Sequence, residues 1–239
     1  MTDDRREPRA ESRELFEQLG DKVGIEDALG TGGLIALGQG RHEERLALML
    51  EAVDVDLEVG KKWGAAAMLG FSATVPFSQG DLDRTRRLAK RGLELAREAG
   101  ARDVLCVTLH PLATIALAEG DHERAKHLFE EGASLSLEVE EKVNAAFCLD
   151  GLAAIAAEEE DTQHAARLWG AAEAILEDIE VISYPYASDH SSRQSQVDAA
   201  RIRLDERTWT QAWAEGRAMT PDEAVAHALV EGETSPALP

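Results

Sequence analysis

The sequence predicts an all-α protein in which a helical hairpin recurs every forty residues. Ala, Leu, Glu and Arg dominate the composition and aromatic residues make up only 5%, which favours helices over strands. Turn-like tripeptides recur at 39–41 (QGR), 79–81 (QGD), 119–121 (EGD) and 159–161 (EED). A second set of breaks falls midway between them, at Gly20, Gly60, Gly100, Glu140 and Glu180. Each period therefore contains two segments of roughly 18 residues joined by short turns, which is a helical hairpin.

Apolar residues align when the chain is laid against itself at this step. In each hairpin we call the first segment the leading one and the second the trailing one. The leading segments share the leucine column Leu29, Leu69, Leu109, Leu149, and the trailing segments share the column Leu48, Leu88, Leu128, Leu168. The trailing segments carry apolar residues at i, i+3, i+4 and i+7, as the core face of an amphipathic helix does. One column stays small throughout (Ala52, Gly92, Gly132, Ala172) and predicts a close approach of helices.

These patterns divide the chain into five parts. We expect a partial leading helix at 1–20, four hairpins over 21–180, a loop at 181–191, capping helices over 192–231 and a flexible tail at 232–239. Thr220, Pro221 and Glu223 predict the start of the last helix, with a capping box. Pro111 lies well inside its helix and predicts a kink or break near Leu109 and His110, whereas Pro76 is easier to accommodate.

Charge and cysteine usage limit the classes of function. Lys and Arg number 25 against 46 Asp and Glu, so the net charge is −21 and phosphate backbones or anionic lipids would be repelled. Cys106 and Cys148 form no CxxC pair, which argues against a disulfide framework or zinc site. The amino terminus lacks an apolar leader segment, and no long uninterrupted apolar run occurs. We expect a soluble cytoplasmic protein that binds neither nucleic acid nor membrane.

The aligned residues resemble the tetratricopeptide repeat. The fourth repeat matches that consensus with a set of apolar and small residues around a turn, namely Leu149, Leu152, Ala153, Glu160–Asp161, Ala165, Trp169 and Ala172. The first repeat departs from it at Gly32 and Arg45. The tail AWAEGRAMTPDEAVAHAL is similar to the closing motif of the repeat region in bacterial LuxR-type and related signal-transduction-ATPase transcriptional regulators. The resemblance implies a right-handed α-solenoid of about four tetratricopeptide-like hairpins with a C-terminal helical cap.

Those regulators usually carry an upstream ATPase domain, but no GxxxxGK[ST] phosphate-binding motif occurs in this sequence. The GTGG cluster at 30–33 lacks the required Lys and Ser/Thr, so we interpret it as a packing or flexible site. Because the first helix aligns with only part of a trailing segment, the chain is expected to begin in the middle of a repeat.

No catalytic, cofactor-binding or metal site is predicted. His122 and His127 resemble a zinc-protease helix, but five residues place them roughly 140° apart on the helix, too far to share a metal. No GxSxG nucleophile motif occurs. Asp189, His190 and Ser191 are adjacent in sequence, whereas the groups of a catalytic triad converge in space. We therefore expect a protein that is not an enzyme and has no cofactor.

The resemblance also predicts where a partner would bind, because leading helices line the concave face of a tetratricopeptide stack. The candidate groove residues are Asp27, Leu34, Thr74, Phe77, Val107, His110, Thr114, Phe147 and Asp150. This mostly apolar and neutral set suits a protein or peptide helix, an apolar small-molecule effector or the protein's own tail. The alternative, that these residues only pack neighbouring hairpins, stays open.

Two functions remain from the sequence. The first is a protein-interaction or effector-sensing module associated with a bacterial transcriptional regulator. The second is a freestanding scaffold or oligomerisation module without a ligand, for instance a homodimer.

Overall fold

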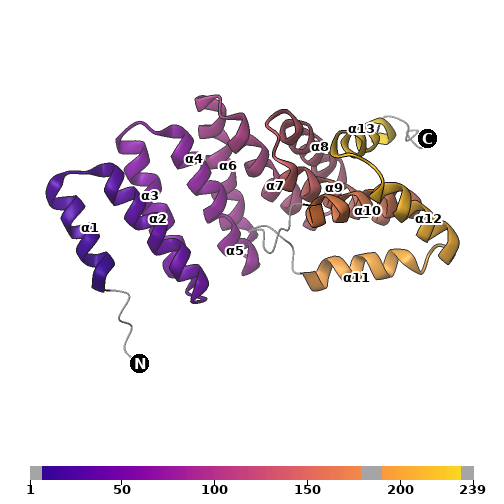
Figure 1. Ribbon diagram of the computed structural model, residues 1–239, viewed down its shortest axis with the longest axis horizontal. Helices are drawn as coiled ribbons and strands as arrows, with labels where there is room; N and C mark the ends of the chain where they lie inside the picture. Colours follow the sequence, from indigo (N-terminus) through magenta and orange to yellow (C-terminus); the bar gives the residue numbers. More distant parts are fainter. Residues whose placement is uncertain (1–6, 179–189, 233–239) are drawn as a thin grey trace. The chain divides into compact units, whose positions relative to one another are not determined.

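A computed structural model describes residues 7–178 and 190–232, and these residues form helices joined by short turns, with no strand among them (Figure 1). The predicted all-helical class is therefore confirmed. Residues 7–178 form ten helices: α1 (Glu7–Leu19), α2 (Lys22–Gly38), α3 (His42–Glu58), α4 (Lys62–Ser72), α5 (Thr74–Ser78), α6 (Leu82–Ala99), α7 (Arg102–Ala118), α8 (His122–Glu138), α9 (Lys142–Glu158) and α10 (Thr162–Asp178). Three more follow: α11 (His190–Arg201), α12 (Glu206–Arg217) and α13 (Pro221–Gly232).

The chain divides into two compact units. Unit 1 is Met1–Val104 and unit 2 is Leu105–Pro239, so the boundary falls near the start of α7. In unit 1, α2 packs on α3, α3 on α4 and α4 on α6. In unit 2, α8 packs on α9 and α9 on α10. The sequence periodicity did not indicate this division, because it continues through α7 without change.

Helix endings repeat every twenty residues with one hydrogen-bond pattern. After α7, Gly120 N–H donates to Leu117 O and Asp121 N–H donates to Ala116 O, both at 2.9 Å, which is the Schellman ending. The residue that turns the chain has a positive φ at every such site, and it is glycine at 20, 40, 60, 80, 100 and 120 but glutamate at 140 and 160. The predicted turns in this range are confirmed, while Glu180 lies outside the described residues.

Aspartate often begins the next helix directly after the turn. Asp81 accepts a hydrogen bond from the Arg84 amide, and Asp121 accepts one from the Arg124 amide. A short side-chain acceptor at this position satisfies a backbone donor that the first helical turn leaves unpaired. The Gly-Asp pairs of the sequence thus end one helix and start the next within two residues.

Each unit has an apolar core on the predicted face of its helices. Leu29, Ala52 and Val55 are among the residues that form one core in unit 1. The unit 2 core is larger and includes Phe129 and Trp169, both almost fully buried. The small column behaves as expected in both units: a Cβ added at Gly92 would lie 3.2 Å from Ala66 O, and one at Gly132 would lie 3.0 Å from Cys148 Sγ.

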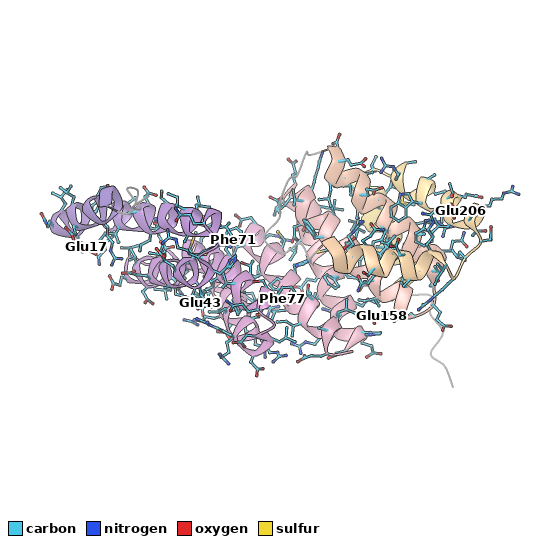
Figure 2. The ribbon with its side chains drawn as sticks, turned by 90° about the horizontal axis from the view of Figure 1, so that it is seen from below. Glu17, Glu43, Phe71, Phe77, Glu158 and Glu206 are labelled. Carbon is cyan, nitrogen blue, oxygen red and sulfur yellow. The ribbon has the colours of Figure 1, made fainter. Side chains whose placement is uncertain are left out.

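Pro76 and Pro111 affect their helices in the reverse of the predicted way. The interruption occurs at Ala73, between α4 and α5, because Pro76 has no N–H for the carbonyl four residues earlier. Phe71 and Phe77 lie on either side of this interruption (Figure 2). In contrast, α7 continues through Pro111, so the expected break near Leu109 and His110 is wrong.

Three helices, α11 to α13, occupy the C-terminal region. α11 begins at His190, within the segment predicted as a loop, and most of that segment and of the 232–239 tail lies outside the described residues. At the start of α13, Thr220 N–H donates to Glu223 Oε2 at 2.9 Å and Glu223 N–H donates to Thr220 Oγ1 at 3.3 Å. The predicted capping box is confirmed. α13 packs on α8 and α9, which places it on the core of unit 2.

Among the described helices, none combines the length and hydropathy needed to cross a bilayer.

Candidate functional site

A cavity of about 380 Å³ opens between α10, α11 and α12 in unit 2. Its volume falls within the range of about 300–1,000 Å³ typical of small-molecule pockets. Charged and aromatic side chains line it together, which distinguishes it from the alanine-rich helix contacts of the core. The residues that matter most for its chemistry are Glu173, Arg193, Asp198, Arg201, Trp209, Trp213 and Arg217.

The cavity exists because the helix order changes after α10. Elsewhere a trailing helix packs on the leading helix that follows it, as α8 does on α9. After α10, it is α12 that packs closely, whereas α11 contacts α9 and α10 only in part (Figure 1). The space between α11 and the α10–α12 pair is the cavity.

Two glycines allow α12 to approach α10 this closely. A Cβ at Gly216 would overlap the carbonyl oxygen of Arg167, and a Cβ at Gly170 would overlap that of Trp213. Each glycine thus faces the backbone of the other helix, and neither contact can be relieved by moving a side chain. Arg167 Nε also donates to Glu215 Oε2 at 2.9 Å across the same contact.

The indole rings of α12 form the apolar wall of the cavity. Trp209 is 4% exposed and Trp213 is half-buried, with ring centroids 5.6 Å apart. Trp213 Nε1 donates to Glu173 Oε2 at 3.1 Å, which fixes the ring against α10. Trp209 also packs near Trp169, with centroids 6.4 Å apart, so this wall is continuous with the core.

Arginines are held in the wall by carboxylates. Arg217 donates to Glu173 Oε2 at 2.7 Å and to Glu177 Oε2 at 2.6 Å. These hydrogen bonds raise the pKa of Arg217, and the bond from Arg217 lowers the pKa of Glu177. Arg201 pairs with Glu206, which begins α12 and is labelled in Figure 2.

α11 is attached to α9 through a residue of the predicted groove. Arg193 Nε donates to Asp150 Oδ1 at 2.5 Å, and Arg203 Nη1 donates to Ala157 O at 2.8 Å. Val197 and Ala200 are the buried apolar contacts of α11, and a second cavity of about 90 Å³ lies between α9 and α11. α11 is therefore fastened mainly by polar contacts at its two ends.

The predicted groove residues are distributed over both units. In unit 1, Asp27 and Leu34 of α2 are exposed, Leu34 at 70%, while Thr74 is buried and Phe77 half-buried in α5. Thr74 Oγ1 donates to Phe71 O at 2.8 Å, a local contact within the interrupted helix.

In unit 2 the structure brings some of the predicted residues together. The His110 ring lies 6.0 Å from the Phe147 ring and 5.6 Å from that of Phe129. Thr114 Oγ1 donates to His110 O at 3.0 Å. Burial lowers the pKa of His110 to about 4, so the imidazole is neutral at pH 7. The side chain of Val107 lies outside what the structure describes.

No opening forms beside Pro111 at His110, because α7 is continuous there and His110 is only 6% exposed between aromatic rings. In the described part of the chain, no cluster of three or more His, Cys, Asp or Glu residues could hold a metal ion.

The cavity was not predicted from the sequence, because the candidate groove residues all lie on leading helices. One signal was present: Trp209 follows Trp169 at the same forty-residue step, and Trp213 lies one helical turn later. That spacing continues the trailing-helix column into α12. It indicates that α12 packs as the trailing helix of a repeat does, whereas the closing motif predicted only a cap.

The chain is similar in fold to a solved structure, the crystal structure of BtubC (BKLC) from P. vanneervenii, with a TM-score of 0.62 and 15% sequence identity. The match covers 97% of this chain and 92% of the other. No protein-family model and no curated protein matches the chain. At this identity the likeness shows the fold, an all-helical one, and nothing about activity.

Proposed function

We propose that this chain is a non-enzymatic, tetratricopeptide-like α-solenoid module that senses an effector and associates with a bacterial transcriptional regulator. The observation that carries the sensing role is the cavity between α10, α11 and α12, which combines two indoles with fixed charged groups. The twenty-residue helix rhythm and the fold likeness support the repeat architecture. The closing motif of the sequence supports the link to a regulator.

The position of the cavity also supports a sensing role. It is bounded by α11, which has few buried apolar residues and is fastened by Arg193 and Arg203 at its ends. A ligand in the cavity would contact α11 and α12 together. Binding would therefore stabilise one position of α11 on α9, and the exposed side of α11 could present that state to a partner protein.

The test is thermal unfolding of the full chain against a panel of small metabolites that includes sugars, amino acids, nucleotides and fatty acids, together with a mass measurement in solution. A ligand that binds only the folded state raises the melting temperature by an amount that grows with the logarithm of its concentration above Kd. We expect at least one class to do so, and Ala214→Phe, which fills the cavity, to abolish the shift. Ala218→Phe is the matched control, because Ala218 is exposed just after α12.

A concentration-independent dimer with no stabilisation by any class would contradict the sensing role and favour the scaffold. Stabilisation that persists in Ala214→Phe would place the binding site elsewhere and remove the observation on which the proposal rests.

A further inference from the structure

The solvent-facing side of α6 is basic, although the chain as a whole is strongly acidic. α6 contains six basic residues against three acidic ones, whereas α3, the preceding trailing helix, contains one arginine against six acidic residues. Arg87, Lys90 and Arg91 of α6 are exposed and follow the spacing i, i+3 and i+4, so their side chains lie on one face of the helix. We call these three residues the α6 patch.

The packing of the repeat does not require positive charge at these positions. Ala89, Gly92 and Leu95 belong to the buried side of α6, and the α6 patch lies on the opposite side of the helix. The neighbouring trailing helices carry no lysine or arginine in the same columns, which hold Ala47, Leu50 and Glu51 in α3 and His127, Glu130 and Glu131 in α8. Helices with neutral or acidic residues there pack in the same repeat, so the charge of the α6 patch serves something other than packing.

The protein neutralises the α6 patch only in part. Arg91 Nη1 donates to Glu94 Oε2 at 3.3 Å, but both side chains are more than half exposed, and such a pair contributes little stability. Arg87 and Lys90 form no hydrogen bond or ion pair with the described part of the chain. Like charges three and four residues apart destabilise a helix. The patch therefore costs α6 some stability and presents cations that a partner can neutralise.

The surroundings of the α6 patch limit the size of an anionic partner. The patch extends about 6 Å along the helix axis, and Asp83 and Glu94 border it on α6 itself. Glu43 of the acidic helix α3 approaches from the preceding repeat, where its Oε2 lies 3.4 Å from Arg84 Nη1. Duplex DNA carries one phosphate charge for about every 1.7 Å of its axis and would extend past the patch onto these carboxylates. A flat anionic bilayer would meet them as well, so a short acidic segment of a protein fits best.

A short acidic helix matches the α6 patch in charge and in spacing. Carboxylates at i and i+4 of such a helix are about 6 Å apart, as are the side chains of Arg87 and Arg91. We infer that the α6 patch binds an acidic helix of a partner protein, whose carboxylates pair with Arg87, Lys90 and Arg91. The inference goes beyond the sensing role proposed above, because α6 belongs to unit 1 and the effector cavity to unit 2.

The experiment is fluorescence anisotropy with a labelled, alanine-based helical peptide whose glutamates recur at i, i+3, i+4 and i+7, titrated with the full chain. We expect binding at about 50 mM NaCl that weakens at about 300 mM NaCl, since the contacts are exposed ion pairs. A peptide of equal length and charge with two central prolines, which prevent helix formation, should bind at least about fivefold more weakly.

The diagnostic variant is the triple substitution Arg87→Gln, Lys90→Gln and Arg91→Gln, which removes the charge of the α6 patch and keeps good helix formers. Its matched control removes the same charge from three exposed positions of unit 2: Arg124→Gln, Lys142→Gln and Arg207→Gln. The patch variant should bind the helical peptide at least about tenfold more weakly, and the control should stay within about twofold of the wild type. The melting temperature of the patch variant should not fall, because the substitutions relieve like-charge repulsion.

Three results would overturn the inference: no binding of the helical peptide at low salt, equal affinity for the proline peptide, or an equal loss of affinity in the control variant, which would show that only net charge matters. Tighter binding of duplex DNA, or of vesicles containing phosphatidylglycerol, that is lost in the patch variant would assign the patch to another class of partner. If the patch variant melts lower, Arg87→Lys with Arg91→Lys, which keeps the charge, should still bind the peptide as the wild type does. A loss of binding in that variant would also contradict the inference.

Discussion

Unit 1 and unit 2 build the same helix junction with side chains of opposite size. The junction joins the end of a trailing helix to the start of the next leading helix, eight residues later. At the α1–α2 and α3–α4 junctions of unit 1, the large residue lies on the trailing helix: the ring of Phe16 covers Gly24, and the carboxyl group of Asp56 covers Gly64. At both glycines a Cβ would overlap that side chain. Only one of the two positions can therefore carry a large residue.

In unit 2 the large residue lies on the leading helix. Asn144 occupies the position of Gly64, two periods later, and Ser136 occupies that of Asp56. Asn144 Nδ2 donates to Ser136 Oγ at 2.7 Å and to Cys106 O at 3.0 Å, so the amide ties three helices together. The two junctions therefore pair one large with one small side chain in either order, while the polarity of the large side chain differs between them.

The large buried side chains of the two junctions differ in charge and hydrogen bonding, and this difference affects the free energy of unfolding. The Asp56 side chain is 0% exposed, and neither of its oxygens has a hydrogen-bond donor among the described residues. Lys61 Nζ lies 3.8 Å from Asp56 Oδ1 but forms its ion pair with Glu26. Burial, together with the nearby Glu26 carboxylate, raises the pKa of Asp56 to about 6. Unit 1 thus contains a buried acid where unit 2 contains a neutral hydrogen-bonded group.

The largest expected effect is at a third contact, which only unit 2 has. Gly216→Ala places a methyl group on the backbone of Arg167, and we expect the unfolding free energy of unit 2 to fall by more than about 3 kcal/mol because two helices must separate. Urea denaturation followed by tryptophan fluorescence measures this. Gly30→Ala in unit 1 is the matched control: nothing lies within 4 Å of its added Cβ, so the substitution should stabilise by up to about 1 kcal/mol. Equal effects at the two sites would refute the close α10–α12 contact.

The second effect is a pH dependence confined to unit 1. Since the folded-state pKa of Asp56 is above its ordinary 3.8, its contribution to stability is complete below about pH 4 and is lost as pH rises through 6. The shift of about two pH units corresponds to about 3 kcal/mol. We therefore expect Asp56→Asn to gain up to that amount over the wild type between pH 4 and pH 8 in urea unfolding. A difference that stays constant with pH would show that Asp56 titrates normally.

The third expected effect follows from substitutions at Asn144, in the junction of unit 2. Asn144→Ala removes the donor shared by Ser136 Oγ and Cys106 O, both of which stay buried, and should cost about 2 kcal/mol at every pH between 5 and 8. Asn144→Asp should cost more as pH rises, because it recreates the buried acid of unit 1. Guanidinium unfolding at two pH values separates these cases, and a pH-independent Asn144→Asp would contradict the explanation.

The smallest effect concerns the turns. Unit 1 uses glycine at every positive-φ turn, whereas unit 2 uses glutamate at 140 and 160, with φ of 58° and 67°. Side chains other than glycine are strained there, so Glu140→Gly and Glu160→Gly should each stabilise by about 1 kcal/mol despite the added freedom of the unfolded chain. A rise of a few degrees in melting temperature is the readout, with Glu141→Gly, at the next position and with negative φ, expected to give no such rise.

The fold could be predicted from the sequence to the extent that it depends on local rules. Gly120 and Asp121 mark a turn because a positive φ favours glycine and a helix start favours aspartate, and both effects act within a few residues. The α10–α12 contact could not be predicted, since Gly170 and Gly216 are informative only when their helices are known to face each other. Likewise Asp150 was expected to line an open groove, but Arg193 of α11 covers it.

The regular helix endings also bear on how a gene for such a chain can change length. Because the turns from Gly20 to Glu160 recur every twenty residues with the same pair of hydrogen bonds, removing or duplicating a stretch of 120 nucleotides between them keeps the remaining turns in phase. The α10–α12 contact has no such freedom, since each of its two glycines must face the backbone of the other helix. Recombination can thus lengthen this protein from within while its last helices stay together as one inherited block.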